Sequence, residues 1–110
     1  MQSTVKQPIS RQDLKNDIVV SVAREMRLRP HLFALSNANI QLLAKGRQAI
    51  AIIMRRRITG ITQTEIGECL GGYKQRRVSK WIEDGKDNPE VMEIVENAAN
   101  FKNADFGTGM

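Results

Sequence analysis

Apolar residues recur at intervals of three and four along most of this chain, the spacing that places them on one side of an α-helix. The first stripe of this kind consists of Leu14, Ile18, Val22 and Met26. Ser10 followed by Asp13 has the spacing of a helix-capping box. Pro30 ends the helix at about Leu28, because the residue before a proline resists the helical conformation. We therefore predict one helix that begins after Ser10 and a short helical turn over 31–35.

A second long helix is predicted from Arg47 onward. Its buried side is formed by Ile50, Ile53, Met54 and Ile58. Gly60 suits the position just past its end. Gly46 weakens any helix that runs through it, because glycine has a low helix propensity. The segment 36–39, Ser-Asn-Ala-Asn, is predicted to be a turn before this helix.

A short helix and a further helix follow. Thr62 with Glu65 repeats the capping-box spacing and opens the short helix. Its apolar residues are Ile66, Cys69 and Leu70. The pair Gly71-Gly72 stops it, and the next helix runs from near Gln75 to about Asp84. The apolar side of that helix consists of Val78, Trp81 and Ile82.

The last helix is predicted after Gly85, which closes the preceding one. Asp87 or Asn88 can cap it, and Pro89 suits its first turn. Its buried residues are Val91, Val95 and Ala98. No stretch alternates apolar and polar residues well enough to be a strand. The predicted fold class is therefore all-α, a bundle of about five to six helices.

This helical bundle is predicted to form one domain over residues 10–101. Residues 1–9 have no apolar periodicity, and we expect them to be a flexible N-terminal arm. Residues 102–110 are expected to be a flexible C-terminal tail.

Charge is distributed unevenly along the chain. Residues 1–44 hold six Lys/Arg against three Asp/Glu, residues 45–80 nine against two, and residues 81–110 two against seven. The three net charges are +3, +7 and −5, and the total is +5. Clustered charge focuses a field that scattered charge does not. The cationic middle therefore favours an anionic partner, nucleic acid first and an anionic membrane second.

Several classes of protein are disfavoured. Cys69 is the only cysteine, so no internal disulfide can form, and no His/Cys cluster has the spacing of a zinc site. The longest apolar run, Ala49–Met54, is far shorter than the roughly 20 residues of a membrane helix, and the start of the chain lacks the pattern of a secretory signal. We find no nucleophile–base pair. We therefore expect a cytoplasmic protein that is not an enzyme and uses no cofactor, no metal and no membrane.

The segment 62–84 has the pattern of a helix-turn-helix, in which two short helices are joined by a glycine turn and the second is cationic at its start. With Val78 facing the interior, a step of about 100° per residue leaves four polar side chains on the outer side. These are Arg76, Arg77, Ser79 and Lys80. The planar fork of arginine can donate two hydrogen bonds to guanine, and it pairs equally well with phosphate. Glu83 and Asp84 come later in the helix, so we expect it to enter a DNA groove by its N-terminal end.

Three features allow two interpretations each. The segment Arg55-Arg56-Arg57 lies in the last turn of its helix, where cations complement the helix dipole, and it is also placed to contact DNA. Trp81 is expected in the core because it shares the side of Val78, with a base-stacking role as the alternative. His31 is expected to have a surface or capping role rather than to bind a metal, because it has no evident partner ligand.

From Asp17 to about Phe101 the sequence resembles the C-terminal DNA-binding domain of the bacterial replication initiator DnaA. The segment AKGRQAIAIIMRRR, then TEIGECLGGYKQRRV, follows that family's basic helix, its EIG-x-x-(apolar)-GG element and its recognition helix in the same order. The resemblance implies a Trp-repressor-like helix-turn-helix and DNA contacts from these three elements. The implied contact set is Arg47, Gln48, Arg55, Gln63, Thr64, Lys74, Gln75, Arg76, Arg77 and Lys80. The helical spacing adds Ser79.

The sequence departs from the family in two places, and it also lacks a motif that a full initiator has. The family's recognition helix begins with Asp-His-Thr-Thr, where this chain has Lys74 to Arg77, and different side chains imply a different DNA target. The segment 37–43 carries no charge where the family has an arginine-rich loop. No G-x-x-x-x-G-K-[ST] motif occurs, so the chain lacks the ATP-binding machinery of a full initiator.

The sequence therefore predicts sequence-specific binding of double-stranded DNA by a nucleoid-associated regulator of transcription or replication. The alternative is an interaction adaptor that binds a replication protein or polymerase instead of DNA. Whether the protein acts as a monomer or a homodimer stays open, because helix-turn-helix proteins commonly bind as dimers, whereas the resemblance implies a domain that can bind as a single unit.

Overall fold

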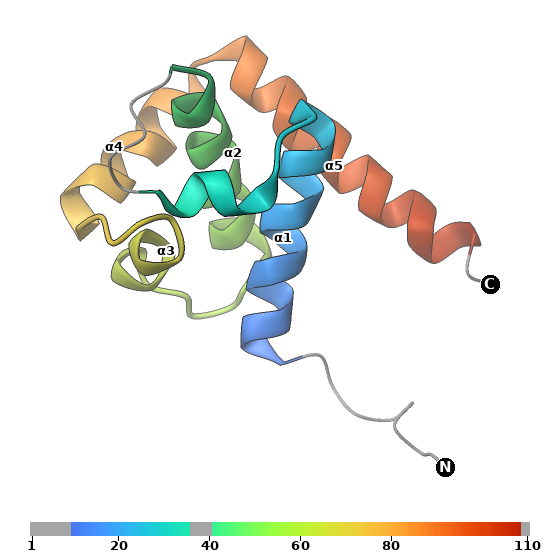
Figure 1. Cartoon of the computed structure of the whole chain (residues 1–110), viewed down its shortest axis with the longest axis horizontal. Helices are drawn as coiled ribbons and strands as arrows, with labels where there is room; N and C mark the ends of the chain where they lie inside the picture. The colour runs from blue at the N-terminus through green and yellow to red at the C-terminus, as the bar shows by residue number, and fades with distance from the viewer. Residues whose placement is uncertain (1–9, 36–40, 109–110) are drawn as a thin grey trace.

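The chain folds as an all-α bundle. The computed structural model describes residues 10–35 and 41–108, with side chains described as far as residue 98. Its elements are α1 (Arg11–Met26), the 3₁₀ helix η2 (Pro30–Ala34), α2 (Gln41–Arg57), α3 (Gln63–Cys69), α4 (Gln75–Lys86) and α5 (Pro89–Thr108) (Figure 1). No strand occurs within the described residues, which confirms the predicted fold class. The predicted arm 1–9 and the predicted turn 36–39 lie outside them.

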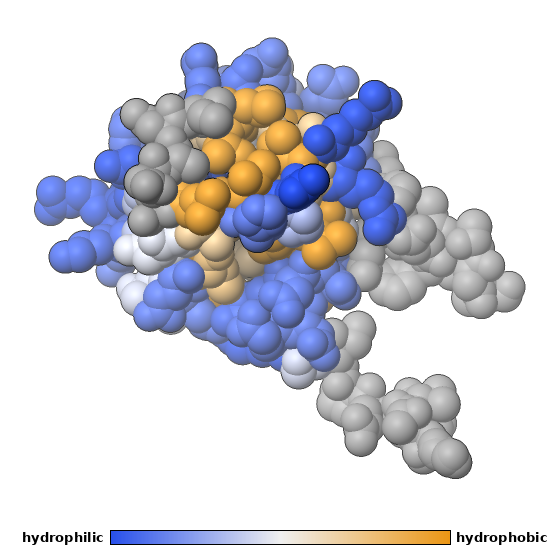
Figure 2. All heavy atoms as spheres, viewed as in Figure 1, coloured by the Kyte–Doolittle hydropathy of each residue, from blue (hydrophilic) through white to orange (hydrophobic). Residues whose placement is uncertain are grey.

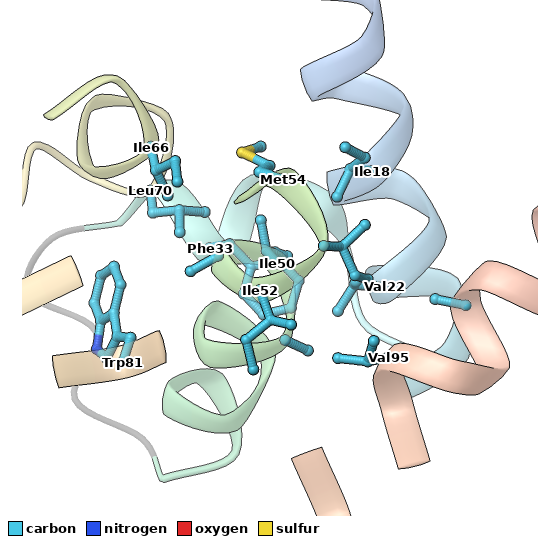
Figure 3. Close-up of a cluster of buried hydrophobic side chains, with 14 of the residues drawn as sticks. Ile18, Val22, Phe33, Ile50, Ile52, Met54, Ile66, Leu70, Trp81 and Val95 are labelled. Carbon is cyan, nitrogen blue, oxygen red and sulfur yellow. The ribbon is translucent and has the colours of Figure 1, made fainter. Parts of the chain in front are cut away.

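α2 is the central helix, with α1 and α5 on one side and α3 and α4 on the other (Figure 1). The six residues from Ala49 to Met54 are all buried. Six residues make more than one and a half helical turns, so this segment is enclosed on every side. Figure 3 shows the α2 side chains between Val22 of α1 and Trp81 of α4. The longest apolar run of the chain is thus the centre of its core.

The predicted caps of α1 and α3 are present. The side-chain oxygen of Ser10 accepts the backbone N–H of Asp13 at 3.0 Å, and that of Thr62 accepts the N–H of Glu65 at 3.1 Å. α1 ends slightly earlier than expected, because Arg27 adopts a left-handed conformation with φ 60°. Local hydrogen bonding therefore fixes the starts of two helices, as the sequence indicates.

α2 begins earlier than the sequence predicted. The helix starts at Gln41 and continues through Gly46, so the predicted start at Arg47 is wrong. A Cβ atom on Gly46 would lie 2.2 Å from Cε1 of Phe33. This glycine therefore serves a close contact between α2 and η2, and the buried contact outweighs its low helix propensity.

α4 also continues past a glycine that was expected to close it. The helix includes Gly85 and ends at Lys86, two residues past the expected end, so the prediction that Gly85 closes it is wrong. Gly85 is buried, and a Cβ atom there would lie 2.8 Å from Cδ1 of Ile52. The missing side chain allows α4 to pack closely on α2.

α5 begins as predicted and extends further than predicted. Pro89 is its first residue, and the side-chain oxygen of Asn88 accepts the N–H of Glu90 at 2.9 Å. Its buried residues are Val91, Val95 and Ala98. The helix continues to Thr108, since no glycine or proline interrupts residues 90–106. The flexibility of 102–110 stays a prediction.

Among the described residues, the helices lack the combination of length and apolar character that crossing a bilayer requires.

Candidate nucleic-acid interface

One carbonyl group organises the turn between α3 and α4. The carbonyl oxygen of Gly67 accepts the backbone N–H groups of Leu70, Gly72 and Tyr73, at 3.1, 2.9 and 3.1 Å respectively. Gly71 and Gly72 have φ angles of 112° and 86°, in the region that side chains with a Cβ rarely adopt. The glycine pair therefore lets the chain turn within a few residues and sets the start of α4.

Gly67 lies in α3 directly against this turn. A Cβ atom at Gly67 would lie 1.9 Å from the carbonyl oxygen of Tyr73 and 3.2 Å from Cγ2 of Val78. The glycine spacing of the segment 65–72 therefore has a physical basis in this chain. Gly67 leaves room for the backbone of Tyr73. Gly71 and Gly72 adopt the positive φ angles that the turn requires.

α4 has one buried side and one cationic side, in the orientation that the helical spacing predicted. Val78 is 0% exposed and Trp81 is 6% exposed, so Trp81 is a core residue. The exposed residues at the start of the helix are Lys74, Gln75, Arg76, Arg77 and Lys80, and Ser79 is partly buried. The predicted outward set therefore shares one side of the helix.

Tyr73, which the sequence pattern did not single out, connects the turn to α4. Its ring centroid lies 5.0 Å from that of Trp81, and the rings make an angle of 71°. The guanidinium carbon of Arg77 lies 5.5 Å from the centre of the tyrosine ring. The sequence signal was present: this is the only tyrosine, and it directly follows the glycine pair.

Arg47 does not lie on this surface, contrary to its place in the implied contact set. It is only 4% exposed, and its guanidinium donates to the carbonyl oxygens of Phe33 and Leu35, at 3.1 and 2.6 Å. It also lies over the ring of Tyr73, with 5.1 Å between the guanidinium carbon and the ring centre. The adjacent Gly46 packs against Phe33, so Arg47 lies beside the end of η2, whose carbonyl groups it binds. Its role is structural.

Gln48 is likewise unsuited to a surface contact. It is partly buried, and within the described part of the chain its buried side-chain oxygen has no hydrogen-bond partner. Its Cβ lies 3.2 Å from the position that a Cβ on Gly85 would occupy. Gln48 therefore belongs to the packing between α2 and α4.

Two hollows flank α4. The first, which we call the turn hollow, is lined by Gly72, Tyr73, Lys74, Arg76, Arg77 and Lys80. The second, which we call the α2–α4 groove, lies between these two helices and the start of α3. Its polar lining includes Arg55, Arg56, Gln63, Ser79, Glu83 and Lys86. Thr64 and Gln75 are exposed at the starts of α3 and α4.

The three consecutive arginines at the end of α2 are divided between two faces. Arg55 and Arg56 line the α2–α4 groove. Arg57 lines a separate hollow with Leu14 and Asp17 of α1. Only the first two therefore lie beside α4, in a groove that they share with Ser79, Glu83 and Lys86. Arg56 joins the candidate set although the implied contact set left it out.

Acidic residues limit the cationic surface at the far end of α4. The ammonium of Lys80 lies 3.4 Å from a carboxylate oxygen of Asp84, one helical turn later. Glu83 lies in the lining of the α2–α4 groove. The uncompensated positive charge of α4 therefore lies mainly in its N-terminal half, as the charge order predicted.

An ion-pair cluster attaches α3 to α1. Nε and Nη2 of Arg11 donate to the two carboxylate oxygens of Glu65, at 2.7 and 3.1 Å, and the Lys15 ammonium donates at 3.1 Å. These hydrogen bonds lower the pKa of Glu65 to about 2. The carboxylate in the first turn of α3 is thus compensated within the protein, and it helps fix the helix pair on the bundle.

Residues that often bind metals or act as nucleophiles form few candidate sites in the described part of the chain. No group of three or more His, Cys, Asp or Glu side chains there could hold a metal ion. Burial raises the pKa of the Cys69 thiol, which disfavours the reactive thiolate. His31 is exposed in η2.

Comparison of the chain with protein-family models, with curated proteins and with solved structures found no match.

Proposed function

We propose that the protein binds double-stranded DNA through α3 and α4, which act as a helix-turn-helix with the N-terminal half of α4 in the major groove. The main support for the proposal is that α4 has one buried side and one exposed cationic side. Val78 and Trp81 hold one side in the core, while the cationic residues of its first turns are exposed. A helix fixed in this way presents its outer side chains to base edges at a constant spacing.

Residues next to α4 supply contacts to the DNA backbone. Arg55 and Arg56 lie in the adjoining α2–α4 groove. Phosphate contacts of this kind fix the position of a protein on the duplex without reading its sequence. The acidic end of α4 is repelled by phosphates, which favours entry by the cationic end.

On this proposal, the protein binds DNA in the manner of the DnaA DNA-binding domain that its sequence resembles. The resemblance rests on the EIG-x-x-(apolar)-GG element, whose glycines form the turn before α4. Because Lys74 to Arg77 differ from the initiator's recognition residues, we propose a different DNA target and a role as a nucleoid-associated regulator of transcription or replication.

Fluorescence anisotropy with random and genomic duplexes tests the proposal. Affinity should fall steeply as salt is raised, with a logarithmic slope of about −0.9 per phosphate neutralised. Replacing Arg76 and Arg77 by alanine should weaken binding by roughly 1–3 kcal/mol for each arginine that reads a base. Arg57→Ala, on the other face, is the matched control and should change little. No binding at low salt would reject the proposal.

A second candidate is an adaptor that binds a replication protein or polymerase. Figure 2 shows apolar residues gathered on the face where η2 lies. Leu35 and Leu42 are 43% and 46% exposed, more than large apolar residues usually are. Binding to a purified partner that survives nuclease treatment, is abolished in Leu35→Ser with Leu42→Ser and persists in Arg76→Ala with Arg77→Ala would favour this candidate.

A further inference from the structure

Tyr73 is at the centre of a stack that begins in the core and ends at the candidate DNA surface. The guanidinium groups of Arg47 and Arg77 lie 5.1 and 5.5 Å from the centre of its ring. The ring of Trp81 packs against it at 5.0 Å. α2 thus meets the glycine turn and α4, from which α3 separates it in the sequence, at one aromatic side chain.

The inner part of this stack is fixed. Arg47 is buried and donates to two carbonyl oxygens at the end of η2, those of Phe33 and Leu35. Trp81 is buried in the side of α4 that faces the bundle. The tyrosine ring therefore rests on groups that cannot move independently of the core, and it offers a fixed surface to the exposed Arg77.

Contact with an aromatic ring uses none of the five N–H donors of a guanidinium group. Arg77 can therefore stay stacked on Tyr73 and still donate two hydrogen bonds to a guanine edge. A long side chain that is already restrained also loses less rotamer freedom on binding. The stack favours a base-reading role for Arg77 over a loose contact with phosphate.

We propose that Tyr73 is the positioning residue that directs Arg77 toward one base pair, and that it thereby sets part of the sequence specificity. This inference rests on the proposed DNA binding and identifies how one of its contacts becomes selective. We propose no positioning of Arg76 by Tyr73. Arg76 is exposed one residue before Arg77.

Selection of duplexes from a random pool, carried out with the wild type and with variants, tests this inference. The base pair read by Arg77 is the position at which Arg77→Ala loses its preference. Tyr73→Leu should lose the preference at that same position, with discrimination falling roughly five- to tenfold, a decrease in the range of a cation–π interaction. Tyr73→Phe keeps the ring and should retain the preference. Arg76→Ala, the matched control, should retain it too.

Binding titrations give a second and independent comparison. Arg77→Ala should cost little further affinity in the Tyr73→Leu background, because the stack is already absent, whereas Arg76→Ala should cost the same in both backgrounds. Tyr73→Met, which also lacks a ring, gives the same comparison should Tyr73→Leu fail to fold. Fluorescence of the single tryptophan reports folding of each variant.

NMR of the free protein tests the stack without DNA. The Arg77 side-chain protons should be shifted upfield by the tyrosine ring in the wild type and in Tyr73→Phe, and this shift should vanish in Tyr73→Leu. Preference at the Arg77 position that persists in Tyr73→Leu would overturn the inference while leaving DNA binding intact. Failure of the wild type to bind any duplex would instead overturn the proposed function, and this inference with it.

Discussion

Gly67 and Tyr73 touch through their backbones. The carbonyl oxygen of Gly67 accepts the N–H of Tyr73 at 3.1 Å, and a Cβ atom on Gly67 would lie 1.9 Å from the carbonyl oxygen of Tyr73. Backbone cannot rotate away as a side chain can, so this contact leaves no room for any residue other than glycine. The position and direction of α4 depend on it.

Gly67→Ala should therefore destabilise the protein although alanine favours a helix. Overpacking costs about 1–3 kcal/mol, and a Cβ atom 1.9 Å from a backbone oxygen belongs at the upper end of this range, above the gain of about 1 kcal/mol in helix propensity. Urea unfolding followed by Trp81 fluorescence measures the difference. Glu68→Ala, exposed in the same helix, is the control and should stay within about 0.5 kcal/mol of the wild type. A Gly67→Ala protein as stable as the wild type would contradict this explanation of the turn.

Alanine variants of Arg47 and Arg55 should have different effects, the first on folding stability and the second on DNA binding. Arg47→Ala removes buried charge-assisted hydrogen bonds to two carbonyl groups and should cost about 2–4 kcal/mol of folding free energy. Arg55→Ala, at an exposed position, should leave stability within about 0.5 kcal/mol of the wild type and lower the affinity for DNA. Thermal unfolding and anisotropy on both variants provide the comparison. Unchanged stability of Arg47→Ala would show that its buried position is misassigned.

Gly46 should tolerate a side chain only if its neighbour shrinks. A Cβ atom there would lie 2.2 and 2.6 Å from two ring carbons of Phe33. Gly46→Ala alone should destabilise by up to about 2 kcal/mol, the overpacking cost of about 1–3 kcal/mol less the gain of about 1 kcal/mol in helix propensity, and Phe33→Leu alone should also destabilise because it leaves a cavity. The double variant should be more stable than the sum of the two losses implies, and chemical denaturation of all four proteins measures this coupling. Simple additivity would argue against the contact.

The Glu65 cluster should make stability depend on pH in the acid range. Hydrogen bonds from Arg11 and Lys15 lower the pKa of Glu65 from 4.5 to about 2. A lowered pKa in the folded state means that the ionised carboxylate stabilises the fold above pH 4.5 and that this contribution is lost as the pH falls toward 2.

Glu65→Gln should therefore have a lower melting temperature than the wild type at neutral pH, and the two curves should converge between pH 4.5 and 2. Melting temperatures measured across this range provide the test. Glu68→Gln, in the same helix, controls for the removal of one carboxylate. A constant difference between wild type and Glu65→Gln at every pH would exclude the ion pairs as its cause.

Local signals in the sequence predicted a large part of the fold. Caps such as Thr62 and the start of α5 at Pro89 depend on residues within a few positions of each other, so they can be recognised without tertiary information. The buried side of α4 follows from the spacing of Val78 and Trp81, and this spacing alone placed Arg76 and Lys80 on the outside.

Tertiary contacts explain what the sequence did not predict. Gly46 and Gly85 look like helix breakers until Phe33 and Ile52 are seen to occupy the space beside them. The burial of Arg47 depends on carbonyl groups at the end of η2, those of Phe33 and Leu35, to which no local pattern around Arg47 points. The stack on Tyr73 joins residues from separate helices, and periodicity within one helix cannot reveal it.

Chemical-shift perturbation of backbone amides during titration with a duplex tests the central claim most directly. If α3 and α4 bind DNA as proposed, the largest shifts will fall on residues 72–80, with further shifts at 55–56 and 63–64, and the outer faces of α1 and α5 will be unaffected. Shifts confined to α1, η2 or α5, or no shifts at low salt, would contradict the claim.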